Sequence, residues 1–136
     1  GAGSDTIVGG GGDDIIFGGA GADRFQFSNL LGQGIDRIKD FQSGLDKIII
    51  SALGFGGGLQ PGQAVTAEQF LETTISTATT AEQRLIYNST TGGLFFDADG
   101  AGLGSSSVQF ATLFVDPLNP AQSHPIGLTA ADFSLI

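Results

Sequence analysis

The 136-residue sequence predicts an all-β protein. In this fold a stack of short parallel strands is capped by an antiparallel β-sandwich or roll with one short helix. Two observations support this class. Residues 1–26 consist of consecutive glycine-rich units in a single phase. Residues 34–136 contain short apolar segments separated by glycine, serine and asparagine turns. We expect residues 1–27 to form the repeat segment and residues 28–136 the β-rich cap.

The repeat segment fits G-G-x-G-x-D-x-U-x, where U is a large apolar residue, and the first unit lacks its leading residue. This nonapeptide is typical of a calcium-binding parallel β-helix. Glycine lets the backbone turn tightly, which gathers peptide carbonyls in a concave loop. Calcium takes 6–8 oxygen ligands, so one loop supplies about half a shell and a stacked loop must complete it. A flexible linker would favour Ser, Thr and Pro without a strict phase. The candidate ligands are Gly1, Gly3, Asp5, Gly10, Gly12, Asp14, Gly19, Gly21 and Asp23.

These units resemble the RTX (repeats-in-toxin) family, whose calcium-dependent parallel β-roll occurs in proteins exported by bacterial type I secretion. In that family one turn of the roll takes two nonapeptides, so facing loops are eighteen residues apart. The resemblance implies that Asp5 and Asp23 face one ion. It places Asp14 on the opposite edge, where its upstream partner is absent from this chain. A second ion there depends on a downstream acid.

The segment 34–51 offers such acids. Its apolar positions predict two half-buried strands, at 38–41 and 48–50, joined at Ser43-Gly44. It is similar to the D-x-I-x-D-F…G-x-D-K-I pattern that closes the roll in serralysin-type proteases, where acids of this segment help to bind calcium. Asp36 and Asp40 are the candidates, while Asp46 fits a turn. The alternative is a surface ladder of charges beside Arg37, Lys39 and Lys47.

The second half predicts the cap. Residues 52–65 read as a Gly/Pro connector, and Thr66 as the start of a short helix that buries Phe70 and Leu71. Segments 84–88 and 93–97 flank Ser-Thr-Thr-Gly and predict a hairpin with positive φ at Gly92. Residues 108–115 predict a further strand.

Asp97 and Asp99, followed by Gly100, resemble the opening of an EF-hand loop, but Val108 stands where that loop needs glutamate. Two interpretations stay open: an ion site with other ligands, or a turn in which aspartate caps backbone N–H groups. The surrounding tract 84–113 resembles a segment of the C-terminal regions of RTX exoproteins.

The C-terminal residues 128–136 are similar to the uncleaved type I secretion signal of the serralysin-like class, an acid followed by hydrophobic residues. That resemblance assigns the signal to Asp132, Phe133, Leu135 and Ile136. A final edge strand that packs Phe133 and Leu135 is compatible with it, because the exporter reads the unfolded chain.

Composition narrows the function. The net charge is −9, with five basic residues and no basic patch for nucleic acid. All seven acids in residues 1–50 are the short aspartate, which suits tight loops. Cysteine is absent, and no apolar run is long enough for stable membrane insertion. His124 is the only histidine, so a zinc site or a catalytic triad lacks ligands or a base. We expect a non-catalytic module.

The sequence therefore predicts a secreted, extracellular RTX module. It would fold on meeting extracellular calcium and carry the secretion signal of a larger exoprotein. Its partners would be the type I exporter and an upstream passenger domain. The alternative is an accessory polysaccharide-binding RTX module of a carbohydrate-active enzyme, for which one Tyr, no Trp and five Lys/Arg offer little to bind a polyanion.

Overall fold

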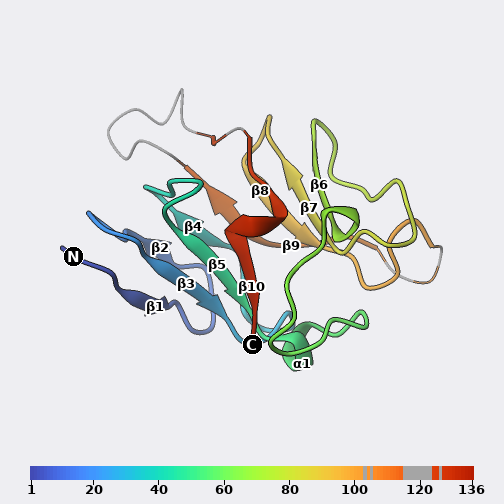
Figure 1. Cartoon of the computed structure of the whole chain (residues 1–136), viewed down its shortest axis with the longest axis horizontal. Coiled ribbons are helices and arrows are strands. Elements are labelled where there is room, and N and C mark those ends of the chain that lie inside the picture. The colour runs from blue at the N-terminus through green and yellow to red at the C-terminus, as the bar shows by residue number, and fades with distance from the viewer. Residues whose placement is uncertain (103, 105, 115–123, 126) are drawn as a thin grey trace.

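The computed structural model describes residues 1–102, 104, 106–114, 124–125 and 127–136. Strands are the main regular secondary structure of these residues (Figure 1). The strands are β1 (Thr6–Val8), β2 (Ile15–Ile16), β3 (Arg24–Phe27), β4 (Asp36–Ile38), β5 (Lys47–Ile50), β6 (Phe70–Thr73), β7 (Leu85–Asn88), β8 (Gly93–Phe96), β9 (Val108–Leu113) and β10 (Phe133–Leu135). A helix, α1 (Ala52–Phe55), and 3₁₀ turns at Ala67–Gln69 and Ala130–Asp132 complete the assigned elements.

The first five strands wind as a roll. They alternate between two sheets, one ordered β1-β3-β5-β10 and the other β2-β4-β9-β8-β7-β6. Each strand of the roll pairs in parallel with the strand two places along the chain, so that Ile7 lies beside Phe25 and Phe25 beside Ile48. One turn of the roll therefore takes two repeat units, as the resemblance implied.

The core lies between the two sheets. The apolar U positions point into it, and Phe25, Ile38 and Ile48 are at most 1% exposed. Complete burial of such side chains stabilises the fold by about 1.5–3 kcal/mol each. Contacts between aromatic rings extend the core toward the cap, because the Phe55 ring packs edge to face against both Phe110 and Phe96. The roll and the cap thus share one hydrophobic cluster.

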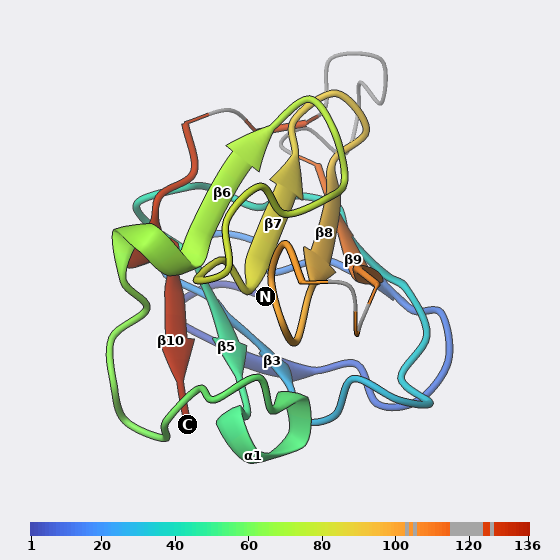
Figure 2. The ribbon, with the colours of Figure 1, turned by 90° about the vertical axis from the view of Figure 1, so that its right-hand side faces the viewer.

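The cap extends the second sheet (Figure 2). β7 and β8 form the predicted antiparallel hairpin, with φ of 76° at Gly92, and β8 pairs antiparallel with β9. The fold class is all-β as predicted, but β4 with β9, β6 with β7 and β5 with β10 pair in parallel. The cap therefore continues the parallel winding of the roll as well as adding an antiparallel part.

Three local predictions differ from the structure. The helix expected from Thr66 is a single 3₁₀ turn whose capping box forms, and Phe70 already begins β6 because it pairs with Leu85. The expected connector 52–65 begins with α1, whose N-terminus is capped by the Ser51 side chain. The strand expected at 38–41 is β4, which lies at Asp36–Ile38 because it pairs with β2 and β9, and it belongs to a different sheet from β5.

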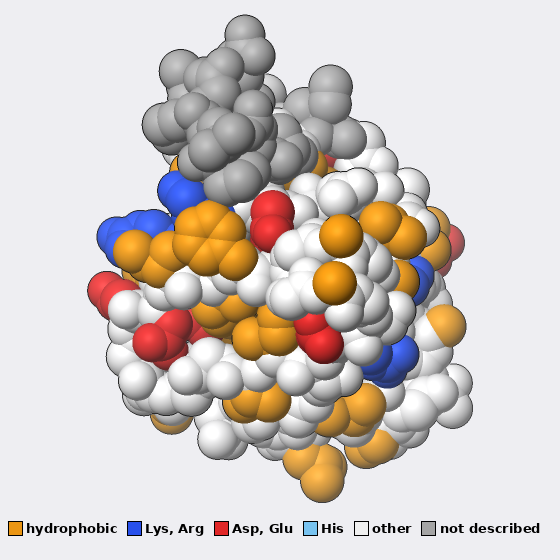
Figure 3. All heavy atoms as spheres, turned by 90° about the vertical axis from the view of Figure 1, so that its left-hand side faces the viewer, with side chains coloured by type: hydrophobic (Ala, Val, Ile, Leu, Met, Phe, Trp, Pro, Cys, Tyr) orange, Lys and Arg blue, Asp and Glu red, His pale blue; other side chains and the backbone are white. Residues whose placement is uncertain are grey.

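The end of the roll formed by β1 and β2 presents a mixed surface. Figure 3 shows hydrophobic atoms near the centre of this face with acidic side chains around them. Val8, Ile15 and Phe17 are more than half exposed. No helix among the described residues is long and apolar enough to cross a membrane.

Candidate calcium sites

Glycines shape each repeat loop in two different ways. Gly10 and Gly12 have φ of 96° and 100°, a region that other residues rarely adopt. Gly9, the first residue of its unit, is required for space instead: a Cβ atom there would lie 2.5 Å from Asp36 Oδ2 and 3.2 Å from Asp14 Oδ2. The repeat therefore needs its first glycine to make room for carboxylates and its later glycines to turn the chain.

On one edge of the roll, the loops 1–5 and 18–23 lie against each other. The Gly3 N–H donates to the Ala20 carbonyl at 2.7 Å, and the Ala20 N–H donates to the Gly1 carbonyl at 3.1 Å. The Asp5 N–H donates to Asp23 Oδ1 at 2.9 Å, and Asp23 is buried. The structure thus brings together Asp5 and Asp23, the pair that the resemblance assigned to one ion.

On the other edge, Asp36 lies beside Asp14, one turn of the roll downstream. The Asp14 N–H donates to Asp36 Oδ1 at 3.1 Å, and the Arg37 N–H donates to the Asp14 carbonyl at 2.7 Å. The second carboxylate oxygens of both aspartates lie close to Gly9, since a Cβ atom there would be within 3.2 Å of each. Asp14 Oδ2 is buried and accepts no hydrogen bond within the described part of the chain. A buried carboxylate oxygen without a donor is costly unless a cation balances it.

Electrostatics at this edge also favour a cation. Burial raises the pKa of the Asp36 carboxyl, the bond from the Asp14 N–H opposes that rise, and the charges of Asp14 and Asp13 raise the pKa further. The carboxylates of this edge therefore destabilise each other when both are ionised. A bound divalent cation removes that penalty.

The loop that supplies Asp36 is a fourth, degenerate repeat, which was not among the units predicted from the sequence. Residues 31–39 read LGQGIDRIK, with positive φ at Gly32 (76°) and Gly34 (87°). Asp36 follows Asp14 by 22 residues, four more than a regular turn of the roll. The signal that could have revealed it is the retained G-x-G-x-D-x-U core. Leu31 stands where the motif has its first glycine, and the residues before it break the nine-residue phase, so the G-x-G-x-D-x-U pattern is not in register with the first three units.

Asp40 and Asp46 both accept from backbone donors, and Asp46 stacks on Asp23 in the same way that Asp23 stacks on Asp5. The Asp40 carboxylate accepts from the Gly18 and Gly19 N–H groups at 2.9 and 2.8 Å. The Asp46 carboxylate accepts from the Asp23 and Gln42 N–H groups at 2.9 and 2.8 Å. Both oxygens of each carboxylate are therefore engaged by backbone donors. Asp46 closes the turn at Gln42, as expected from the sequence, and also contacts the loop of Asp23, while a ligand role for Asp40 stays a prediction.

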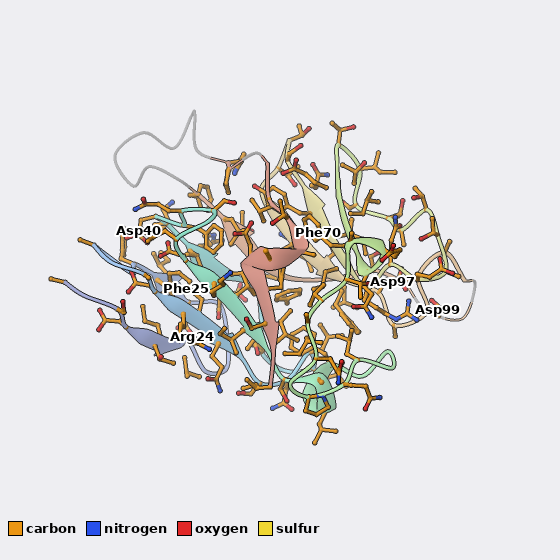
Figure 4. The ribbon with its side chains drawn as sticks, viewed as in Figure 1. Arg24, Phe25, Asp40, Phe70, Asp97 and Asp99 are labelled. Atoms are coloured by element: carbon orange, nitrogen blue, oxygen red, sulfur yellow. The ribbon has the colours of Figure 1, made fainter. Side chains whose placement is uncertain are left out.

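Asp97 and Asp99 lie at the far end of the molecule from Asp40 (Figure 4). The Ser107 hydroxyl donates to Asp97 Oδ2 at 3.1 Å, and the Gly104 N–H donates to Asp99 Oδ2 at 2.8 Å. These bonds are those of a turn in which aspartates hold the backbone, one of the two open interpretations. The structure does not bring this pair to the repeat loops, and its ion site stays a prediction.

The donor set of the repeat loops suits calcium. Within the described residues, no group of three or more His, Cys, Asp or Glu side chains is placed to hold a metal. An ion at either edge would therefore draw on two carboxylates and on peptide carbonyls, an all-oxygen set. Calcium prefers such hard ligands in flexible number, whereas zinc prefers nitrogen and sulfur.

Comparison with known families agrees with this chemistry. Residues 1–26 match the family model described as the RTX calcium-binding nonapeptide repeat (4 copies). The N-terminal segment is an RTX calcium-binding repeat array. RTX nonapeptide repeats bind Ca²⁺, so calcium is the ion of these loops. No curated protein matches the chain. The degenerate unit at 31–39 lies beyond the matched residues.

Proposed function

We propose that this chain is a non-catalytic, calcium-triggered folding module of a larger secreted protein, and that residues 128–136 are its type I secretion signal. The observation that supports the calcium part best is the apposition of Asp14 and Asp36, with a buried Asp14 oxygen that has no donor among the described residues. A passenger domain upstream would supply any activity of the parent protein.

Repulsion between the paired aspartates is the reason why folding would require calcium. Without calcium, the folded roll must hold Asp5 beside Asp23 and Asp14 beside Asp36 at a net charge of −9. At an effective dielectric constant of about 20, unit charges about 5 Å apart repel by about 3 kcal/mol. This cost is large against the ~5–15 kcal/mol net stability of a typical domain. Extracellular calcium-binding modules work at about 10⁻⁴–10⁻³ M, so the chain would stay unfolded inside the cell and fold outside.

The environment of the C-terminus supports export before folding. Asp132, Phe133 and Leu135 are at most 5% exposed. β10 pairs with β5, and the Asp132 carboxylate accepts from the Ser43 hydroxyl at 2.7 Å and the Gly44 N–H at 2.8 Å. An exporter could read these residues only in the unfolded chain. Folding would then withdraw the signal.

Calcium titration of metal-free protein, followed by far-UV circular dichroism, tests the trigger. We expect a cooperative gain of β signal in the sub-millimolar to millimolar range with calcium and none with magnesium. Glu82→Gln, which removes one exposed charge outside the loops, should keep the same midpoint. A protein with full β signal in chelator, unchanged by calcium, would contradict the proposal.

Export is tested separately in bacteria that express a type I exporter. A slow-folding reporter fused before residue 1 should reach the medium, and deletion of residues 128–136 should retain it in the cells. A matched deletion of residues 74–82, a loop of equal length outside the signal, should leave export in place. Equal export with and without residues 128–136 would refute the signal assignment.

A further inference from the structure

An aspartate stands directly before each strand of the first sheet. All neighbouring strands of this sheet pair in parallel, so their first residues lie along one edge, and β10 lies beside β5 (Figure 1). In the order of the strands β1, β3, β5 and β10, the four residues of this row are Asp5, Asp23, Asp46 and Asp132. The row therefore runs from the first edge, the candidate calcium site of Asp5 and Asp23, to the C-terminal strand.

Hydrogen bonds connect the first three members of the row in one direction. The Asp5 N–H donates to Asp23 Oδ1, and the Asp23 N–H donates to Asp46 Oδ1, both at 2.9 Å. The other oxygen of Asp46 accepts from the Gln42 N–H at 2.8 Å and so closes the turn 42–46. This turn is therefore fastened to loop 18–23, which forms one side of the first edge.

Asp132 fastens the same turn from its other side. Its carboxylate accepts from the Ser43 hydroxyl at 2.7 Å and from the Gly44 N–H at 2.8 Å. It also accepts from the Thr129 N–H at 3.0 Å, within the segment that leads into β10. The turn 42–46 thus lies between Asp46 and Asp132 and joins the first edge to the start of β10.

Burial makes it costly to break these bonds one at a time. Asp23, Asp46 and Asp132 are at most 2% exposed. Hydrogen bonds from N–H groups to carboxylates belong to the stronger class, and a buried carboxylate that loses its donor keeps the cost of its desolvation. Loop 18–23, the turn 42–46 and Asp132 are therefore ordered or released together.

The second sheet lacks a corresponding row within the described residues. The Asp36 carboxylate accepts from the Asp14 N–H, but the next strand of that sheet is β9, which follows Ser107. The Ser107 hydroxyl donates to Asp97, at the far end of the molecule from the roll loops. An ion at the second edge therefore has no comparable connection to β10.

From this asymmetry we propose that the turn 42–46 is a relay, through which calcium at the first edge controls whether residues 129–135 are docked. An ion between loops 1–5 and 18–23 would order loop 18–23, and Asp46 and the turn would then hold Asp132 and β10 in place. The proposal rests on the proposed function for its biological meaning, since it states how calcium would withdraw the secretion signal. The coupling is reciprocal, so loosening the turn must weaken calcium at the first edge by the same factor.

Hydrogen exchange of single amides, followed by nuclear magnetic resonance, tests the relay. Calcium is held at the lowest concentration that saturates the parent protein, so that a site weakened about tenfold is left mostly empty. The amide to follow is that of Ile136, which donates to the Ile50 carbonyl at 3.0 Å; the Arg84 amide, which donates to the Gln69 carbonyl at 2.8 Å, reports on the cap. We expect Asp5→Asn to speed exchange at Ile136 about tenfold, within the usual range of coupling between sites, and to leave Arg84 unchanged. Asp36→Asn, which weakens the second edge, should leave Ile136 unchanged as well.

A second pair of variants tests the turn itself. Ser43→Ala removes one donor to Asp132, and Ser89→Ala is the matched control, since the Ser89 hydroxyl donates to the Thr73 carbonyl outside the relay. Ser43→Ala should reduce the effect of Asp5→Asn on Ile136 at least threefold in the double variant, whereas Ser89→Ala should preserve it. Ser43→Ala alone should also weaken calcium at the first edge, reported by the Gly3 amide, and spare the second edge, reported by the Gly12 amide. This titration decides the matter if Asp5→Asn does not fold.

Three results would overturn the relay: equal exchange at Ile136 in Asp5→Asn and Asp36→Asn, an effect of Asp5→Asn that survives Ser43→Ala, or equal loss of calcium at both edges in Ser43→Ala. Failures of the proposed function give different results. A chain that needs no calcium to fold counts against the trigger, and export that survives deletion of residues 128–136 counts against the signal. Neither outcome changes the exchange comparison between the two edges.

Discussion

Asp36→Asn should stabilise the metal-free protein and reduce the stabilisation that calcium provides at the second edge. The substitution keeps an oxygen that can accept from the Asp14 N–H at 3.1 Å, and it replaces the other oxygen, which lies close to Gly9 as Asp14 Oδ2 does, with an N–H donor. It therefore removes the repulsion between two neighbouring carboxylates, and we expect the new N–H group to donate to the buried oxygen of Asp14. It also removes one of the two carboxylates available to an ion.

The magnitudes follow from these two effects. Repulsion between unit charges about 5 Å apart is about 3 kcal/mol at an effective dielectric constant of about 20. A hydrogen bond to a charged group contributes about 1.5–3 kcal/mol. Allowing for local relaxation, we expect the free energy of unfolding of the metal-free protein to rise by about 2 kcal/mol. The stabilisation by calcium should fall by about 2.7 kcal/mol, the contribution of one site held at a hundred times its dissociation constant.

Urea unfolding monitored by circular dichroism measures both quantities, in chelator and in saturating calcium. A fixed concentration of trimethylamine N-oxide in every sample brings the metal-free protein into a measurable range. Glu82→Gln is the control: it removes one exposed charge outside the repeat loops and should change stability by no more than about 0.5 kcal/mol. The reasoning is refuted if Asp36→Asn destabilises the metal-free protein, or if it leaves the calcium-dependent stabilisation intact.

Three other predictions follow from the loops. Asp5→Asn and Asp23→Asn should each raise the calcium midpoint of folding about tenfold, and unchanged midpoints in both would disprove their pairing. Gly18→Ala should weaken calcium binding, because a Cβ atom there overlaps Asp23 Oδ2, while Gly11→Ala should be tolerated, because its Cβ would meet only the Gly32 carbonyl at 3.4 Å; equal titrations would contradict this. Burial raises the pKa of the Asp46 carboxyl above its ordinary value of 3.8, so the folded state binds this proton more tightly than the unfolded chain does. The protonated carboxyl therefore stabilises the metal-free protein at low pH, and this stabilisation is lost as the pH rises from 3.8 through the raised pKa. Asp46→Asn should flatten the pH dependence of urea unfolding in chelator, and parallel curves would exclude the effect.

Much of the roll could be read from the sequence, because its physical requirements are local. The phase of the glycines fixes where the chain turns, and Ile7, Ile16 and Phe25 fix which side of each strand is buried. The pairing of Asp5 with Asp23 required the family resemblance, since spacing alone does not give the number of strands per turn. The structure places the two aspartates across adjacent loops.

The remaining features depend on contacts between distant segments. The capping box at Thr66 provides the hydrogen bonds for one 3₁₀ turn. The helix does not continue, because Phe70 pairs with Leu85 in the sheet, and no local pattern predicts that pairing. Asp36 was a candidate for its charge and its place in the closing segment. The sequence left Asp36 and Asp40 as alternatives for the edge of Asp14, and the stacking of the displaced repeat on the second loop brings Asp36 beside Asp14.

Anomalous X-ray diffraction from crystals of the chain grown in calcium tests the central claim most directly, because it counts and places the ions. We predict one ion between the loops 1–5 and 18–23 and one between the loops 9–14 and 32–36, the latter contacted by Asp14 and Asp36. Ions found only elsewhere, for example at Asp97 and Asp99 with both repeat edges empty, would contradict the account.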